Sequence, residues 1–420
     1  MAWPVRHLPV LQNWDCHGCG ECCREYEVHV TEAERQRILA QGWENDPAIG
    51  GVPLFVRTGP WWRRRWRLNT RPGDDACVFL NEQGRCRIHA KFGGAAKPLA
   101  CQVYPFTLTP AGDHWRVGIR FACPSAADNL GRCVTAHAAD LRAYGRGLEE
   151  REGVRDRPTA PPPLRAGQGV PWADLERFAD ALLAILDRTE RPLEYRLRQC
   201  LALAQLCRQA KFETVTGPRL GEFLGLVTQS LDGEVPPDPA VLGPPSWVGR
   251  ILFRQAIAIY ARRDTGPRQG LSRYGRLALL WAAWRFARGT GRVPRVHGLL
   301  PEATFAQLEQ PAGPLPEASA RMLERYYRVK VQSFQFFGPT NFNTGFWEGL
   351  ESLLFTFPAT LWLARAFADR PREKAVSQAL RIVDDNFGYN RLLGTHRQRL
   401  GTHILAARGE LAKLIAWYAR

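Results

Sequence analysis

The sequence lacks any apolar run long enough to cross a lipid bilayer. Its longest apolar runs, residues 353–364 and 277–284, are shorter than the roughly 20 residues that a transmembrane helix needs. We expect both runs to form buried helices. Residues 1–11 are interrupted by proline and charged residues, so they lack the continuous apolar core of an export signal. These absences predict a cytoplasmic protein with no membrane span.

Lysine is also scarce, although the chain is basic. The formal net charge is +16, from 57 Lys+Arg against 41 Asp+Glu, and nearly all the basic residues are arginine. Residues 1–140 carry only +3 of this charge, from 17 basic and 14 acidic residues, and the rest is spread thinly over the remaining chain. A nucleic-acid-binding face shows clustered basic residues, so we expect no nucleic-acid partner.

Several cofactor-binding motifs are missing as well. The sequence contains no G-x-G-x-x-G fingerprint, no Walker loop and no C-x3-C-x2-C run of the kind that holds a radical-generating cluster. The residues themselves therefore predict no pocket for a nucleotide or for S-adenosylmethionine.

Cysteine, in contrast, is concentrated in one region. Nine of the 11 cysteines lie between Cys16 and Cys133. An odd number, an adjacent pair and the absence of an export signal favour metal ligation in a reducing compartment over a disulfide framework. The other two, Cys200 and Cys207, are seven residues apart on a predicted amphipathic helix, and we expect them in the core.

The first cysteine element reads Cys16-His-Gly-Cys19-Gly-Glu-Cys22-Cys23. Two-residue spacers let neighbouring thiolates converge on one centre, and the two glycines permit the tight backbone that convergence requires. Adjacent residues do not easily reach the same metal atom, so we expect Cys23 to serve a second or a polynuclear centre. Thr31 and Glu34 form a predicted capping box for the helix that follows.

The second element contains Cys77 and Cys86, with eight residues between them. If residues 81–84 form a four-residue hairpin loop, Phe79 faces Cys86 and Cys77 faces Ile88. Cross-strand partners share one face of a hairpin. This pairing would place both thiols on the same side, where they could serve one metal site.

The third element is Lys97-Pro-Leu-Ala-Cys101-Gln-Val-Tyr-Pro-Phe106, followed by Cys123-Pro124. The predicted metal ligands are therefore Cys16, Cys19, Cys22, Cys23, Cys77, Cys86, Cys101 and Cys123. For Cys23 and Cys123 the alternative is a buried small hydrophobe, and the role of Cys133 stays open. We expect the nearby His17, His89 and His114 to be loop residues or hydrogen-bond partners.

These motifs together resemble the CxxCxxCC cysteine-cluster family, a zinc- or iron-chelating domain to which flagellin lysine-N-methylases are related. The likeness covers about residues 13–125. Two positions depart from the family pattern, because Lys97 stands where Arg is usual and His89 where Tyr is common. The resemblance implies a metal cofactor, and it implies S-adenosylmethionine and a flagellin-like protein partner if the chain is a methylase.

Eight cysteines can hold two tetrahedral zinc ions, one [4Fe–4S] cluster with spare thiols, or two clusters. We favour an iron–sulfur cluster because the adjacent pair Cys22 and Cys23 fits a polynuclear site. The sequence leaves open whether the chain is an enzyme. The hypotheses are a lysine N-methylase-like enzyme, a non-enzymatic protein with structural zinc and a partner-binding helical domain, and a redox or metal sensor.

The densest basic-aromatic run is residues 60–67, which read PWWRRRWR. Tryptophan stacking with arginine–phosphate contacts would suit single-stranded nucleic acid. We favour the alternative, an amphipathic strand that covers the metal site and leaves its charges in water.

Proline-rich residues 157–171 separate this region from a helical remainder. We therefore predict a mainly α protein with three parts: a small irregular cysteine-rich domain with a short β-hairpin (residues 1–140), a linker (141–171) and an all-α domain (172–420). Apolar residues at helical spacing predict helices over residues 171–187, 195–209, 251–262, 277–288, 318–337, 348–368, 373–383 and 400–418.

Overall fold

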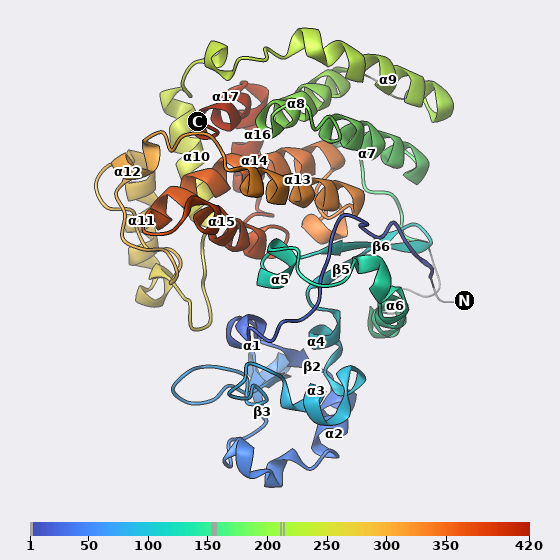
Figure 1. Cartoon of the computed structure of the whole chain (residues 1–420), viewed down its shortest axis with the longest axis vertical. Helices are drawn as coiled ribbons and strands as arrows, with labels where there is room; N and C mark the ends of the chain where they lie inside the picture. The colour runs from blue at the N-terminus through green and yellow to red at the C-terminus, as the bar shows by residue number, and fades with distance from the viewer. Residues whose placement is uncertain (1–2, 153–157, 211, 213–214) are drawn as a thin grey trace.

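The computed structural model describes residues 3–152, 158–210, 212 and 215–420, so residues 153–157 of the predicted linker lie outside the described residues. The chain is mainly helical, with two small three-stranded sheets toward its N-terminal end, which confirms the predicted fold class. Figure 1 shows a small lower part, residues 20–103, which we call the cysteine lobe. The larger upper part, which we call the helical body, contains all the helices from α5 onward.

The cysteine lobe is built from short elements around a small core. They are α1 (Glu21–Glu25), β2 (His29–Val30), α2 (Glu32–Leu39), β3 (Phe55–Thr58), β4 (Arg65–Leu68), α3 (Arg87–Phe92) and α4 (Leu99–Val103). Strands β2, β4 and β3 form an antiparallel sheet in that order. The buried core beneath it holds Val30, Ile38, Trp43, Ile49, Leu54, Leu68, Val78, Phe79 and Ile88.

Two local predictions in this lobe can be compared with the structure. Thr31 caps α2, and both hydrogen bonds of the capping box with Glu34 are present. The basic-aromatic run forms a strand only in its second half, β4, because Trp61–Arg63 make a 3-10 turn. The guanidinium groups of Arg35 and Arg57 both lie over the ring of Trp66 on β4, while Trp61 and Trp62 are exposed.

The second sheet packs against the helical body. Strands β5 (Phe106–Ala111) and β6 (His114–Ile119) form an antiparallel hairpin, and β1 (Val5–Arg6) pairs in parallel with β6. Residues of this hairpin share one continuous hydrophobic core with helices near the C-terminus. The division into domains at residues 141–171 stays a prediction; the structure shows one small core in the cysteine lobe and one large core elsewhere.

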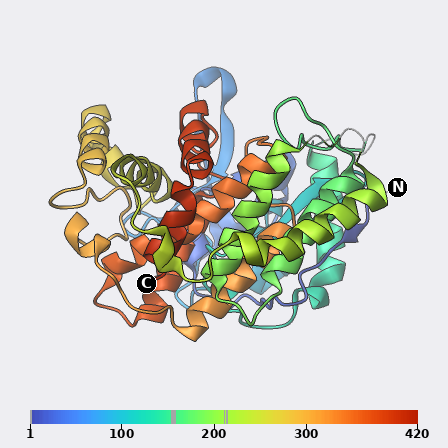
Figure 2. The same cartoon turned by 90° about the horizontal axis from the view of Figure 1, so that it is seen from above.

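The helices of the body are α5 (Pro124–Ala127), α6 (Ala138–Glu152), α7 (Trp172–Leu186), α8 (Leu193–Gln209), α9 (Gly217–Glu234), α10 (Trp247–Tyr260), α11 (Arg276–Arg288), α12 (Phe305–Glu309), α13 (Glu317–Gln332), α14 (Phe346–Ala364), α15 (Arg372–Asn386), α16 (His396–Ala407) and α17 (Glu410–Tyr418). Viewed from above, α7–α9 (green) and α11–α12 (yellow to gold) lie on opposite sides of the C-terminal helices (Figure 2). Helix α14 is buried along almost its whole length, as expected for residues 353–364.

Two expectations for the body are wrong. Residues 277–284 do not form a buried helix, because α11 buries only Ala282 and Phe286 and leaves Leu277 81% and Trp281 50% exposed. Its other side, which carries Leu277, Leu280, Trp281 and Trp284, is exposed. The single helix expected over residues 400–418 is two helices, α16 and α17, separated by Gly409 in the left-handed conformation (φ 71°). No helix in the described part of the chain is long and apolar enough to span a membrane.

Ion pairs join the cysteine lobe to the helical body. Arg268 of the body pairs with both Glu21 and Glu25 of α1. Asp385, at the end of α15, is buried and accepts hydrogen bonds from Arg120 and from the hydroxyl of Tyr26 in the lobe. The helix that carries Cys22 and Cys23 is therefore fixed against the body by charge.

Candidate metal centre

The predicted cysteine ligands lie at or beside the ends of short helices. Cys16 and Cys19 are exposed in the segment that leads into α1, and α1 itself contains Cys22 and Cys23. Cys86 and Cys123 are the N-cap residues of α3 and α5, Cys101 lies within α4, and Cys77 precedes a turn. All 11 cysteines, each of them among the described residues, are free thiols.

The first two cysteine elements pack directly against each other. The amide of Cys77 donates a hydrogen bond of 2.8 Å to the carbonyl oxygen of Cys23. The glycines of the Cys16–Cys22 segment lie on the turn before Cys86, where Gly84 is so close to Gly18 that a Cβ at Gly84 would be 2.1 Å from the Gly18 carbonyl oxygen. Gly84 has φ +74°, so glycine is required there for both its conformation and its size.

Four thiols from separate segments lie within electrostatic range of one another in this part of the lobe. The thiol of Cys77 interacts electrostatically with those of Cys22, Cys86 and Cys101. The thiol of Cys101 interacts in turn with those of Cys22 and Cys86. We call this set, Cys22, Cys77, Cys86 and Cys101, the thiol cluster.

The surroundings of Cys22, Cys77 and Cys101 disfavour bare thiolates. Burial raises the pKa of Cys77 and brings that of Cys101 to about 12, while the charge of Lys97 opposes the rise at Cys101. The neighbouring thiol of Cys23 is the largest cause of the raised pKa of Cys22. Such thiols are unreactive by themselves. A bound cation supplies the positive charge that their deprotonation requires, so the donor set suits a metal.

The structure also separates some of the predicted ligands. Cys123 lies in the large core rather than in the lobe, 7% exposed, although its thiol interacts electrostatically with that of Cys22. Within the described part of the chain, no three cysteine sulfurs lie within 4.8 Å of one another. The sulfurs of Cys22 and Cys23 are 4.0 Å apart, close to the roughly 3.8 Å between two sulfurs on one tetrahedral zinc ion. Their adjacency therefore does not by itself assign them to different centres.

The predicted hairpin between Cys77 and Cys86 has a different register. Cys86 pairs with Leu80 rather than with Phe79, and Cys77 pairs with Thr70 rather than with Ile88. The physical reason is that α3 begins at Arg87, which takes Ile88 into a helix and into the lobe core. Cys77 and Cys86 are nevertheless brought near each other, because the chain turns tightly between them.

The remaining cysteines and two histidines are placed as follows. Cys200 and Cys207 are fully buried in α8, which confirms their assignment to the core. Cys133 receives a hydrogen bond from Thr135 and donates one to a backbone oxygen. His17 contacts the Asp15 carbonyl and the Ser125 hydroxyl, and His89 lies in the last turn of α3.

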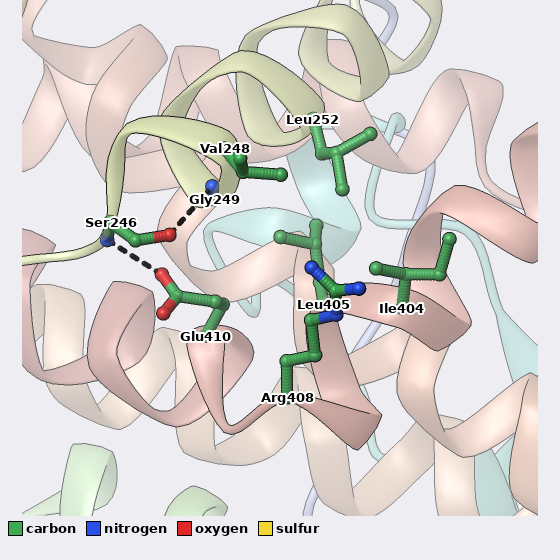
Figure 3. A pocket seen from close by; sticks show the side chains of 8 residues that line it. All are labelled: Ser246, Val248, Gly249, Leu252, Ile404, Leu405, Arg408 and Glu410. Atoms are coloured by element: carbon green, nitrogen blue, oxygen red, sulfur yellow. Dashed lines mark hydrogen bonds between the residues drawn. The ribbon is translucent and has the colours of Figure 1, made fainter.

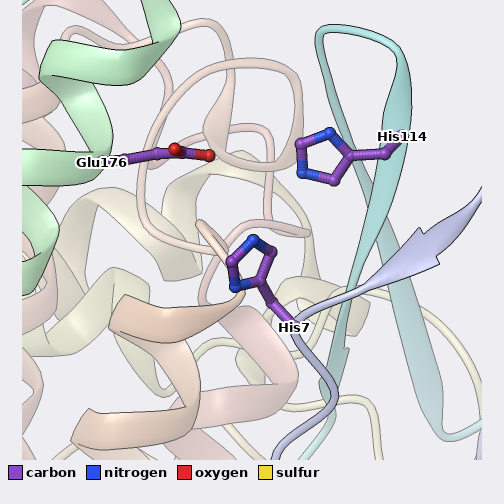
Figure 4. A group of neighbouring side chains, drawn as sticks. All are labelled: His7, His114 and Glu176. Carbon is purple, nitrogen blue, oxygen red and sulfur yellow. The ribbon is translucent and has the colours of Figure 1, made fainter.

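A second group of potential ligands was missed by the sequence reasoning. His7, His114 and Glu176 each offer one atom, and the three atoms lie within 4.8 Å of one another. Figure 4 shows the two rings and the carboxylate facing one another. They come from the end of β1, the start of β6 and the second turn of α7. No local motif could reveal them, because their meeting depends on the parallel pairing of β1 with β6.

Neither of the two best-formed cavities is lined by a cysteine. The larger, about 270 Å³, lies between α10 and α16–α17, where the Glu410 carboxylate accepts a hydrogen bond from the amide of Ser246 (Figure 3). The smaller, about 160 Å³, lies beside α1 between the lobe and the body and is lined by Tyr26, Asp75 and Gly266 among others. Sites for drug-sized ligands usually measure about 300–1,000 Å³, so both cavities are small.

Comparison with known proteins supports metal binding for this region. Residues 15–124, about a quarter of the chain, match a family model named CxxCxxCC, described as a "Putative zinc- or iron-chelating domain". An uncharacterized protein from Methanocaldococcus jannaschii is 22% identical over 109 residues, which are 26% of this chain and 33% of that protein. The chain thus matches only a third of the length of this relative. No solved structure matches the chain.

Proposed function

We propose that this chain is a metalloprotein whose cysteine lobe holds zinc or an iron–sulfur cluster through the thiol cluster. One observation carries the proposal: four thiols from separated segments lie within electrostatic range of one another in one part of a small lobe. The ligands in this proposal are Cys22, Cys77, Cys86 and Cys101. Four thiolates suit either a tetrahedral zinc ion or a [4Fe–4S] cluster.

The small size of the lobe explains what such a centre would contribute. The lobe core contains nine buried apolar residues, and a core of this size stabilises a fold only weakly. Structural zinc in small domains has an apparent binding free energy of about 10–16 kcal/mol at neutral pH. A metal held by these thiols would therefore stabilise the arrangement of α1, α3, α4 and the turn between Cys77 and Cys86.

The other predicted ligands lie outside the thiol cluster. Cys16 and Cys19 are exposed, and Cys123 approaches Cys22 from the helical body. Together with Cys23 they supply enough thiols for a second zinc ion or for a polynuclear centre. Our preference for iron–sulfur rests on the adjacency of Cys22 and Cys23 in the sequence, since the 4.0 Å between their sulfurs fits a single zinc ion as well.

Transfer of a methyl group to lysine is implied by the resemblance to flagellin lysine-N-methylases alone. Such an enzyme needs a pocket for S-adenosylmethionine and a surface for its protein substrate. The cavity beside α1 is about 160 Å³, which is small for a ligand of that size. The proposal therefore ends at the metal centre and assigns no reaction.

Metal analysis of two alanine variants tests the proposal. The chain is purified anaerobically, and its zinc, iron and acid-labile sulfide are measured together with its absorption spectrum. We expect Cys101→Ala to lower the metal content by at least half and to lower the thermal unfolding midpoint. The reason is that this variant removes one of four converging ligands.

Cys200→Ala is the matched control, because Cys200 is also a free thiol in a helix but is buried in the core of the body. We expect it to keep the metal content of the unmodified chain. Equal metal loss in both variants, or none in Cys101→Ala, would refute the ligand assignment. A colourless protein that contains zinc and no labile sulfide would exclude the iron–sulfur form.

A further inference from the structure

His114 is the fixed member of the second group of potential ligands. Its side chain is 7% exposed. Its Nδ1 is 3.1 Å from a carboxylate oxygen of Asp113, so Nδ1 carries the proton and its N–H donates a hydrogen bond to that carboxylate. Its Nε2 is buried and has no hydrogen-bond partner among the described residues. A buried imidazole nitrogen without a partner is costly and indicates a missing ligand.

The pairing of Asp113 with His114 has the form that metal-binding histidines adopt. A histidine ligand usually donates its second N–H to a carboxylate, which fixes the tautomer and makes the other nitrogen a better ligand. The free Nε2 of His114 points toward His7 and Glu176 (Figure 4). The orientation of His114 therefore fits metal binding and leaves its free nitrogen in the middle of the group.

The backbone at His7 turns its side chain toward this group. Val5 and Arg6 pair with Trp115 and Arg116 of β6, and an extended continuation would place His7 on the same face as Trp115. Instead His7 has φ 53°, a left-handed conformation that histidine adopts more often than most residues. Its ring centroid is consequently 5.7 Å from that of His114.

Glu176 completes the group and is oriented by a neighbouring cation. Arg116 donates to one oxygen of Glu176 at 2.5 Å and to the Gln332 carbonyl at 3.0 Å, with its guanidinium stacked over Phe334. The second oxygen of Glu176 has no part in this ion pair. Arg116 repels a cation, but Glu176, Asp113 and nearby Asp180 bring three carboxylates to the same region.

We propose that His7, His114 and Glu176 form a second metal site, which takes a divalent transition-metal ion such as zinc. Two imidazoles and one carboxylate are a common protein ligand set for zinc with an open fourth position. Ligand atoms on a tetrahedral zinc ion are about 3.3 Å apart, so the present separations of up to 4.8 Å must shorten. His7 is exposed and lies just after the end of β1, so it can make this movement. The site shares no residue with the thiol cluster.

Titration of the intact, anaerobically purified chain with Co²⁺ tests this site. Cobalt bound by imidazole and carboxylate shows visible d–d bands, whereas cobalt bound by cysteine adds intense thiolate charge-transfer bands. We expect one equivalent of Co²⁺ to bind without charge-transfer bands, and Zn²⁺ to displace it. His7→Asn, which suits the left-handed backbone, should weaken binding at least about 100-fold. Asp113→Asn should weaken it about tenfold, the range seen for outer-shell partners.

His396→Asn is the control, because His396 is exposed and lies on α16, outside this group of ligands. It should bind Co²⁺ as the unmodified chain does, and the metal content of the cysteine lobe should be the same in all these proteins. Circular dichroism confirms that His7→Asn is folded. The proposal is overturned if the unmodified chain binds no such equivalent, if all bound cobalt shows thiolate bands, or if His7→Asn binds with unchanged affinity.

Discussion

At the scale of single residues, His297 is an example of a buried group that must remain neutral. It is 4% exposed, and its Nδ1 accepts a hydrogen bond from the Leu299 amide at 3.0 Å. Burial, with the charges of Arg263 and Arg268, lowers its pKa from 6.5 to about 4, although Asp385 acts in the opposite direction. Protonation would place a donor where the Leu299 amide needs an acceptor.

This environment predicts that stability falls as the pH decreases from 6.5 to 4. Above pH 6.5 the imidazole is neutral in both the folded and the unfolded chain. Between pH 6.5 and 4 the unfolded chain binds a proton that the folded chain does not, so the free energy of unfolding decreases. The contribution of His297 over this window is on the order of 3 kcal/mol. Urea unfolding at pH 7.5 and pH 4.5 measures the change in the free energy of unfolding.

The variant His297→Asn isolates this contribution from other titrating groups. Its side-chain oxygen can accept the Leu299 hydrogen bond and does not titrate. We expect the variant to lose less stability between pH 7.5 and pH 4.5 than the unmodified chain. Equal losses in the two proteins would show that His297 is not kept neutral by the fold.

At the scale of elements, glycine contacts hold the loop before α1 against the turn before α3. A Cβ on Gly84 would overlap the Gly18 carbonyl oxygen, and a Cβ on Gly20 would touch Leu80 at 3.4 Å and lie 3.7 Å from the Gly84 Cα. This contact brings the Cys16–Cys22 segment to the turn that carries Cys77 and Cys86. The position of the Cys16–Cys22 segment relative to this turn therefore depends on Gly84 having no side chain.

Gly84→Ala should consequently separate the two elements and reduce metal binding. The new methyl group requires movement of the Gly18 backbone, because 2.1 Å is far below any contact distance. We expect a loss of at least half of the bound metal, measured by elemental analysis.

Gly42→Ala is the matched control, since Gly42 has a similar φ of +75° but its Cβ would meet nothing within 4 Å. The control should lose about 1–2 kcal/mol from backbone strain and keep its metal. A Gly84→Ala protein with full metal content would show that the contact is dispensable.

The predictability of the elements follows the range of the interactions that form them. The capping box at Thr31 and helices such as α7 and α13 depend on neighbours within four residues, so the sequence indicates them. Helix α9 was not predicted; four of its first nine residues are glycine or proline, which weakens the helical pattern. The register at Cys86 and the exposure of α11 depend on which distant segments pack nearby. The cysteine motifs are local patterns, so the sequence indicates them. The group of His7, His114 and Glu176 comes from three distant segments, so the sequence does not indicate it.

At the scale of the whole molecule, two separate cores are joined by a buried charged contact. Asp385 is 7% exposed and is paired with Arg120 and Arg263. Burial alone would raise its pKa, but these two guanidinium groups lower it below its ordinary value. Arg263 also donates to the backbone carbonyl of Glu25 in α1. The Asp385 carboxylate is therefore one of the groups that hold the cysteine lobe on the body, together with Arg268 and its partners Glu21 and Glu25.

Asp385→Asn should weaken this contact without removing any predicted metal ligand. The variant leaves Arg120 and Arg263 buried without their anion, and loss of one partner of a buried pair costs about 3–5 kcal/mol. We expect the urea midpoint of unfolding to fall while the metal content of the freshly purified protein is kept.

Asp369→Asn is the control. It changes an exposed carboxylate and should change stability by less than about 0.5 kcal/mol. An unchanged midpoint in Asp385→Asn would mean that the lobe is held by other contacts. Loss of metal together with stability would mean that the lobe needs the body in order to keep its thiols together.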